Sequence, residues 1–128
     1  MRKGIEIRDA HFPDRAPIDA YGNGGFRFAG LSHRGSLLCL PTGIHGWDAT
    51  EESALEPALF ARVLDEAAEI EVLLVGTGTE IRRLPPELKI RLRDAGIISD
   101  PMSTGAAVRT YNVMLAESRA VAAALIAV

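Results

Sequence analysis

The sequence predicts an α/β sandwich built around a largely parallel β-sheet. Strand and helix patterns alternate through the C-terminal two-thirds of the chain, as in parallel strands joined by right-handed helical crossovers. Within this region the short run Val72–Val75 is wholly apolar, which is typical of a strand covered on both faces. The length of 128 residues fits one compact domain, residues 1–128, and leaves no room for a second core.

The N-terminal part of the chain is predicted to form strands. Apolar and polar residues alternate around Ile5 and Ile7, and the same pattern returns at Phe26 and Phe28. An alternation with a period of two residues indicates a strand with one buried face. We therefore predict strands at both places.

A strand pair is predicted from about Phe26 to Leu40. Residues 37–40 form a continuous apolar run, as expected of a buried strand, and residues 32–36 contain a glycine and have the length of a hairpin turn. These strands are expected either to extend the sheet or to cover part of it. The glycine-containing segment 41–48 is predicted to be a loop from its composition.

Two helices are predicted in the middle of the chain. The first begins near Ser53, whose spacing to Glu56 matches a capping box, although Pro57 competes as the first-turn residue. The second begins at Pro85–Pro86, because proline suits the first turn of a helix, and it ends at Gly96.

A third helix is predicted at the C-terminal end. Ile97–Ile98 open a short strand, after which Ser103 can cap a helix whose apolar positions keep helical spacing from Thr104 to Leu125. An unbroken helix of that length would span about 33 Å, nearly the diameter of a domain of this size. A break or kink around Glu117–Ser118 is therefore expected.

Composition and charge exclude several classes of protein. The net charge of −3 argues against a general nucleic-acid binder, and the single cysteine, Cys39, cannot form an internal disulfide. The N-terminus lacks the apolar core of a signal peptide. The longest apolar run, Ala120–Val128, is far shorter than the roughly 20 residues of a membrane helix. We expect a cytoplasmic protein without an integral membrane segment.

The charged residues are sorted along the chain. Seven acidic residues lie between Glu51 and Glu71 with only Arg62 among them, and five basic residues lie between Arg82 and Arg93 with only Glu87. This distribution indicates either two solvated helix faces or a polarised surface that steers a protein partner.

A glycine turn is the first candidate for a binding site. Gly76 and Gly78 follow the predicted buried strand, a position where α/β proteins often bind ligands and where glycine lets backbone amides approach an anion. A dinucleotide-binding motif requires a third glycine that opens a helix at once, and here the next helix begins only at Pro85. The segment is therefore either a tight turn or the floor of a small anion or partner pocket.

A second candidate comprises His45 and Trp47, which together with Asp48 could frame a pocket, although structural packing by Trp47 is the alternative. The histidines have no metal-ligand spacing, so no metal site is predicted. No nucleophile signature occurs, and Cys39 lies in an apolar run where a buried, inert thiol is expected. We predict no catalytic residue and no cofactor.

The third candidate lies on the last predicted helix. Arg109 and Asn112 are neighbours on one face and point away from the apolar stripe of Ala107, Tyr111 and Met114. Tyr111 is nevertheless included with them in the polar set of the candidate surface. Asparagine within a helix lowers helix propensity, which usually indicates a hydrogen-bonding role. Arg109 and Asn112 either tie the helix to a nearby loop or strand end, or they contact a ligand or partner.

Several motifs in order along the chain resemble the Mth938-like family, a domain of unknown function. They are His33–Ser36, Pro41, Trp47, Glu71–Gly78, Leu84–Leu88 and Thr104–Arg119. The resemblance implies a three-layer α/β sandwich with a mixed central sheet and flanking helices. It also implies bacterial and archaeal relatives without an assigned activity, and a eukaryotic branch that includes a mitochondrial assembly factor for respiratory complex I.

This chain departs from the family pattern at two positions. Ser103 stands where the family often has aspartate, and Val108 stands where it often has cysteine. If those groups carry chemistry in the relatives, this chain has lost it. The sequence thus favours a non-catalytic binding or assembly module that acts through a protein partner, as a monomer or weak homodimer. The alternative is a small-molecule or anion-binding protein, or an enzyme, with its pocket near Gly76–Gly78 and with His45 or Arg109 as working groups.

Overall fold

The computed structural model describes residues 11–128, so the strand predicted around Ile5 and Ile7 lies outside the described residues. The strands are β1 (His11–Phe12), β2 (Ala20–Gly22), β3 (Gly25–Phe28), β4 (Leu31–Arg34), β5 (Ser36–Leu40), β6 (Gly43–Trp47), β7 (Val72–Gly76), β8 (Ile98–Met102) and β9 (Val121–Leu125). The helices are α1 (Ala61–Asp65), with the 3₁₀ turns η1 (Pro57–Phe60) and η2 (Ala67–Glu69) on either side, α2 (Pro86–Asp94) and α3 (Thr104–Ala116).

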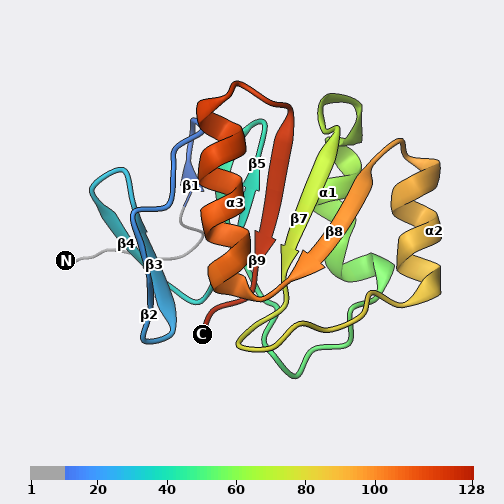
Figure 1. Ribbon diagram of the computed structural model, residues 1–128, viewed down its shortest axis with the longest axis horizontal. Helices are drawn as coiled ribbons and strands as arrows, with labels where there is room; N and C mark the ends of the chain where they lie inside the picture. The colour runs from blue at the N-terminus through green and yellow to red at the C-terminus, as the bar shows by residue number, and fades with distance from the viewer. Residues whose placement is uncertain (1–10) are drawn as a thin grey trace.

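Six of these strands form one mixed sheet in the order β1-β6-β5-β9-β7-β8, and β2, β3 and β4 form a separate antiparallel sheet (Figure 1). The main sheet is parallel only across β9, β7 and β8, which are joined by the crossover helices α2 and α3. The other pairs are antiparallel. The predicted α/β class is confirmed. The prediction of a largely parallel sheet is correct only for β9, β7 and β8.

Both faces of the main sheet are covered, which gives three layers. One face packs against η1, α1 and α2, and the opposite face packs against α3 and the small sheet. Residues toward α1 and α2 include Leu38, Leu73 and Ala122. Residues toward α3 and the small sheet include Leu37, Leu74 and Ala123. The three-layer arrangement with a mixed central sheet, implied by the resemblance, is therefore confirmed.

The predicted hairpin from Phe26 to Leu40 is wrong in its turn and in its pairing. β3 pairs with β4 through a two-residue turn at Ala29–Gly30, where both residues have positive φ angles of 51° and 77°. Such turns match the twist of antiparallel strands. The predicted turn residues 32–34 belong to β4, and Gly35, with φ of 99°, passes the chain from the small sheet into β5 of the main sheet.

The segment 41–48 was predicted to be a loop, and this is also wrong. Only Pro41 and Thr42 form the turn, and the following residues form β6, which pairs with β5. The glycines within β6 suggested a loop, yet each has a packing reason. A Cβ at Gly43 would meet the carbonyl oxygen of Phe12, and a Cβ at Gly46 would lie 3.3 Å from the His33 ring.

The first predicted helix is shorter than expected. Helical structure begins at Pro57 rather than near Ser53, and a 3₁₀ turn on either side leaves α1 with five residues. Ser53 does not cap a helix, because its hydroxyl oxygen instead accepts a hydrogen bond of 2.8 Å from the backbone N–H of Thr50. The capping-box spacing was therefore coincidental.

The third predicted helix is wrong beyond its midpoint. α3 ends at Ala116, and Ser118, with φ of 60°, reverses the chain where the break was expected. The next segment is not helical: it is β9, which lies between β5 and β7 in the centre of the sheet. By contrast, α2 begins at Pro86 and the Ser103 hydroxyl caps α3 by accepting from the N–H of Ala106 at 3.4 Å, as predicted.

No helix among residues 11–128 is long and apolar enough to cross a membrane.

Candidate functional site

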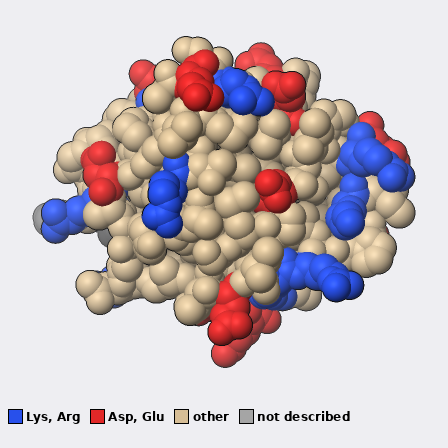
Figure 2. All heavy atoms as spheres, in the orientation of Figure 1, with Lys and Arg blue, Asp and Glu red and all other residues tan. Residues whose placement is uncertain are grey.

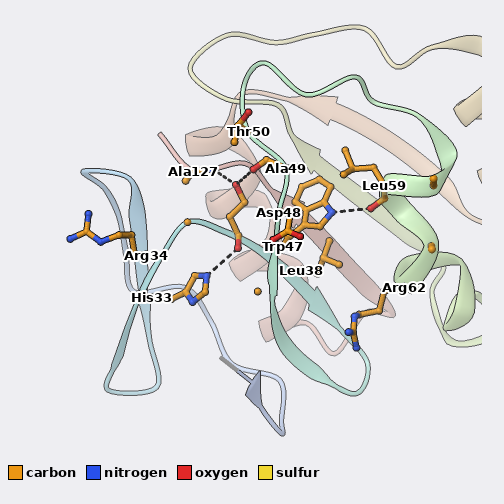
Figure 3. A pocket seen from close by; sticks show the side chains of 15 residues that line it. His33, Arg34, Leu38, Trp47, Asp48, Ala49, Thr50, Leu59, Arg62 and Ala127 are labelled. Atoms are coloured by element: carbon orange, nitrogen blue, oxygen red, sulfur yellow. Dashed lines mark hydrogen bonds between the residues drawn. The ribbon is translucent and has the colours of Figure 1, made fainter. Parts of the chain in front are cut away.

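A cleft of about 750 Å³ lies where β4, β5 and β6 meet the η1–α1 segment (Figure 3). Its lining is mixed in character, with apolar groups such as Leu38 and Ala127, the indole of Trp47, and charged groups from Arg34, Asp48 and Arg62. These side chains come from segments far apart in sequence, from Arg34 to Ala127. The cleft thus depends on the packing of η1–α1 beside the strands.

Trp47 forms part of the cleft wall and is held in place by two contacts. Its indole N–H donates a hydrogen bond of 2.9 Å to the carbonyl oxygen of Leu59. Its ring packs edge-on against Phe60, with centroids 5.4 Å apart. Trp47 therefore packs against the protein and also lines the cleft. The two interpretations from the sequence, structural packing and a pocket wall, do not exclude each other.

The serine in the cleft is structural. Ser36 is buried, and its hydroxyl donates to the carbonyl oxygen of Ala49 at 2.7 Å and accepts from the N–H of Ala127 at 2.8 Å. The Nε2 atom of His33 lies 3.2 Å from the carbonyl oxygen of Ser36, and the His33 ring covers Gly46. His33 forms no hydrogen bond with the Ser36 hydroxyl. With the hydroxyl engaged on both sides, Ser36 is not placed as a nucleophile activated by His33.

Two arginines and one aspartate give the cleft its charge. Figure 3 places Arg34 and Arg62 on opposite sides of the cleft, with Asp48 between them. All three side chains are exposed. His45 lies beside the cleft, with its Nδ1 3.5 Å from Arg62 and its Nε2 3.0 Å from the Thr42 hydroxyl. Such an arrangement can bind a carboxylate-bearing group over an apolar floor.

Sequence reasoning missed Arg34 and Arg62 as members of this site. A signal for Arg62 was present, since it is the one basic residue within the acidic stretch from Glu51 to Glu71. Arg34 lies within the family motif His33–Ser36, but the prediction of a turn there gives its side chain no place in a site.

The glycine turn at the end of β7 is tightly packed. A Cβ at Gly76 would lie 3.0 Å from the Cα of Thr104, so glycine lets α3 approach β7 closely. Gly78 has φ of 113°, and its N–H donates to the Thr104 hydroxyl at 3.0 Å. The adjacent N–H of Thr79 donates to the Glu51 carboxylate at 2.6 Å. The chain's own carboxylate therefore occupies the position that an anion would take.

The three candidate residues on α3 have different environments. Asn112 accepts a hydrogen bond from the N–H of Ile18 at 2.9 Å and donates to its carbonyl oxygen at 2.8 Å. It thus ties α3 to the segment before β2. This agrees with the interpretation that Asn112 holds the helix to a nearby loop or strand end. Arg109 is exposed and bonds to no residue within 11–128, whereas Tyr111 is 1% exposed and does not reach the surface to which we assigned it.

Tyr111 instead pairs with the single cysteine in the core. Its hydroxyl and the Cys39 thiol are hydrogen bonded. Burial raises the pKa of the Cys39 thiol to about 12, and burial also raises the pKa of the Tyr111 hydroxyl above its ordinary value. Both groups therefore stay protonated near neutral pH, and Cys39 does not present a reactive thiolate.

Replacing Asn112 by alanine is expected to reduce the free energy of unfolding by about 2–3 kcal/mol, because the N–H and carbonyl oxygen of buried Ile18 would lose their partners. Urea unfolding measures this loss. The matched control is Lys89→Ala, at an exposed position on α2, which should change stability by less than about 0.5 kcal/mol. Equal effects of the two substitutions would show that the Asn112 hydrogen bonds contribute little.

Comparison with known proteins places the chain in a family. A family model described as "Protein of unknown function (DUF498/DUF598)" matches residues 18–126. The chain belongs to this family. It is 40% identical to an uncharacterized protein of Rhodobacter capsulatus, over 93% of this chain and 90% of that protein. It is also 30% identical to the mouse protein NADH dehydrogenase [ubiquinone] 1 alpha subcomplex assembly factor 3, over 98% of this chain and 68% of that protein.

Solved structures related to this DUF498/DUF598 chain have the same fold. A crystal structure described as an outer membrane protein from Bartonella henselae is 62% identical, with a TM-score of 0.86 over 91% of this chain and 98% of that one. A Bordetella pertussis protein described as a Mth938-like domain is 25% identical, with a TM-score of 0.77 over 95% of this chain and 92% of that one. The resemblance to the Mth938-like family is confirmed.

Proposed function

We propose that this protein is a non-catalytic binding or assembly module that acts in the cytoplasm through a protein partner. The observation that carries the proposal is the cleft beside Trp47, which combines an apolar floor, an aromatic wall and arginines on two sides. The similarity to a mouse protein named as an assembly factor extends over 98% of this chain and supports the same role.

The cleft favours a particular kind of partner segment. Apolar side chains would cover Leu38 and the Trp47 indole, since aromatic residues in clefts often contribute much of the binding energy at protein interfaces. Carboxylates of the segment would pair with Arg34 and Arg62, whose guanidinium groups can each hold a carboxylate through two hydrogen bonds. The partner segment is therefore apolar with acidic side chains.

The alternative of a small anion site near Gly76–Gly78 and Arg109 gains no support from the geometry. The Glu51 carboxylate occupies that turn and would repel an anion. The cleft beside Trp47 is not lined by Gly76, Gly78 or Arg109.

Affinity capture from the native cell tests the proposal. The wild type is compared with the double variant Arg34→Glu/Arg62→Glu and with the matched control Arg91→Glu/Arg93→Glu, which reverses two exposed charges on α2. We expect a protein captured by the wild type and the control, with recovery reduced about tenfold or more by the cleft variant. The purified partner should show the same ranking in a binding titration.

Equal capture by the cleft variant and the wild type would contradict binding through this cleft. Circular dichroism verifies that each variant is folded. Because all four arginines are exposed, none of the substitutions should disturb the core.

A further inference from the structure

One face of the edge strand β8 is uncovered. Ile98, Asp100 and Met102 point to the same side as Val72 and Leu74 of the neighbouring β7, which is the side of the sheet that carries α3. Yet Ile98 is 64% exposed, and Asp100 is exposed as well. On the opposite side α2 covers this edge of the sheet. Within the described residues, β8 is therefore uncovered on the α3 side around Ile98 and Asp100, whereas Met102 at its end packs partly against the core on that side.

The width of a helix explains why this face is bare. A helix is about 10 Å across, and neighbouring strands lie about 4.8 Å apart, so one helix covers about two strands. α3 packs on β7 and β9. Covering β8 as well would require a second helix in the same layer, at the usual interaxial distance of about 8–10 Å from α3.

The outer face of α3 is unusual for a surface helix. Val113 is 54% exposed, and Ala106 and Ala116 lie near it, so Arg109 is the charged residue of that face. Exposed helix faces are normally rich in charged side chains. Figure 2, which views the molecule from the α3 side, shows a broad face with only isolated charged groups.

The two features complement each other. The bare strand carries one acidic residue, Asp100, and the outer face of α3 carries one basic residue, Arg109. Neither side chain forms a hydrogen bond or an ion pair with another residue in the described range. Each has an exposed apolar residue close to it along the same element, Ile98 two residues before Asp100 and Val113 one helical turn after Arg109.

We infer that this face binds a second copy of the same chain. In the resulting dimer, α3 of each protomer lies over β8 of its partner, with Arg109 paired to Asp100 across the interface and Val113 against Ile98. The two main sheets face each other with both α3 helices in one shared layer. A two-fold symmetric interface uses the same surface of both protomers, so one chain must carry both members of each contacting pair. This face carries both Arg109 and Asp100, and both Val113 and Ile98.

This inference goes beyond the proposed function and does not depend on it. The cleft beside Trp47 is walled by η1 and α1, which cover the opposite side of the main sheet. A dimer through α3 leaves that cleft accessible. The two proposals can therefore fail separately.

Sedimentation equilibrium of the purified chain provides the test. The wild type is expected to be a dimer, and Arg109→Asp or Asp100→Arg should each raise its dissociation constant at least about 30-fold by placing like charges together twice. The double variant Arg109→Asp/Asp100→Arg should return to near the wild-type value, because both pairs re-form with reversed polarity. Arg91→Asp on α2 is the control and should have no effect.

Val113→Glu is a second variant that should also produce monomers without altering either charge. A wild type that stays monomeric at all concentrations would overturn the inference, even if another protein is found to bind this face. A dimer that neither single charge reversal weakens would also overturn it. So would failure of the double variant to restore association, provided that circular dichroism shows it to be folded.

Discussion

Replacing Ala123 by aspartate is expected to prevent stable folding at neutral pH. Ala123 lies in β9 at the centre of the sheet, between Cys39 of β5 and Leu74 of β7, and it is 0% exposed. A carboxylate at this position would have neither water nor a cation beside it. An uncompensated buried charge costs about 3–5 kcal/mol, a large part of the roughly 5–15 kcal/mol that stabilises a domain. Urea unfolding followed by circular dichroism measures the loss.

The loss should depend on pH in a defined direction. Burial raises the pKa of a carboxyl group in the folded protein above its value of about 3.9 in the unfolded chain. The folded variant therefore binds more protons than the unfolded one above that pH, so its deficit relative to the wild type grows as pH rises. The deficit in unfolding free energy should be smaller at pH 4 than at pH 8. A deficit that is the same at both pH values would contradict this.

Ala120→Asp is the control for this substitution. Ala120 immediately precedes β9 and is exposed, so an aspartate there stays hydrated. Its effect should be below about 0.5 kcal/mol. If residues 121–125 continued α3 as an amphipathic helix, positions 120 and 123 would lie on the same helix face. The two aspartate substitutions would then reduce the unfolding free energy by similar amounts.

The same segment shows why local sequence patterns gave the wrong element. Alanine is the strongest helix former, and the apolar positions from Thr104 to Leu125 fit a helical stripe. A strand buried on both faces has no alternation of polar and apolar residues that could reveal it. β9 is such a strand, with Ala122 and Ala124 packed on one face and Ala123 on the other. Tertiary pairing with β5 and β7 decided its structure.

Elements with strong local signals were predicted well. β7 is a short apolar run, α2 begins at a proline pair, and the Ser103 hydroxyl caps α3. The misleading signals are glycines, which predict turns at β6 and near β4 where the structure has strands. In β6 the glycines are required by close contacts with Phe12 and His33, which come from distant parts of the chain.

The candidate site could be predicted only in part. Trp47 lines the cleft, as one of the two interpretations anticipated. Arg34 and Arg62 meet there because Gly35 redirects the chain between sheets and because α1 packs beside β5. Neither effect is visible in local periodicity. Tyr111 lies on the apolar stripe of the predicted helix and is correctly buried, so its inclusion in the candidate surface is wrong: its hydroxyl pairs with Cys39 inside the core.

Replacing Thr104 by valine is expected to reduce the free energy of unfolding by about 2–4 kcal/mol. Thr104 is 0% exposed, and its hydroxyl donates to the carbonyl oxygen of Ile126 at 2.7 Å while it accepts from the N–H of Gly78 at 3.0 Å. Valine has the same shape and lacks both functions. Two backbone groups would then remain buried without partners at the junction of β7, α3 and the end of β9. Urea unfolding of the variant and the wild type measures the difference.

Two further substitutions isolate the hydrogen bonds as the cause. Thr104→Ser keeps the hydroxyl and removes one methyl group, so it should cost only about 1 kcal/mol. Thr110→Val, at a half-buried position further along α3, should change stability by less than about 0.5 kcal/mol. If serine at position 104 is as destabilising as valine, the methyl group contributes as much to this junction as the two hydrogen bonds do, which would contradict the hydroxyl as the main cause. If serine retains most of the stability, the hydroxyl links the glycine turn of β7 to the C-terminal end of the sheet.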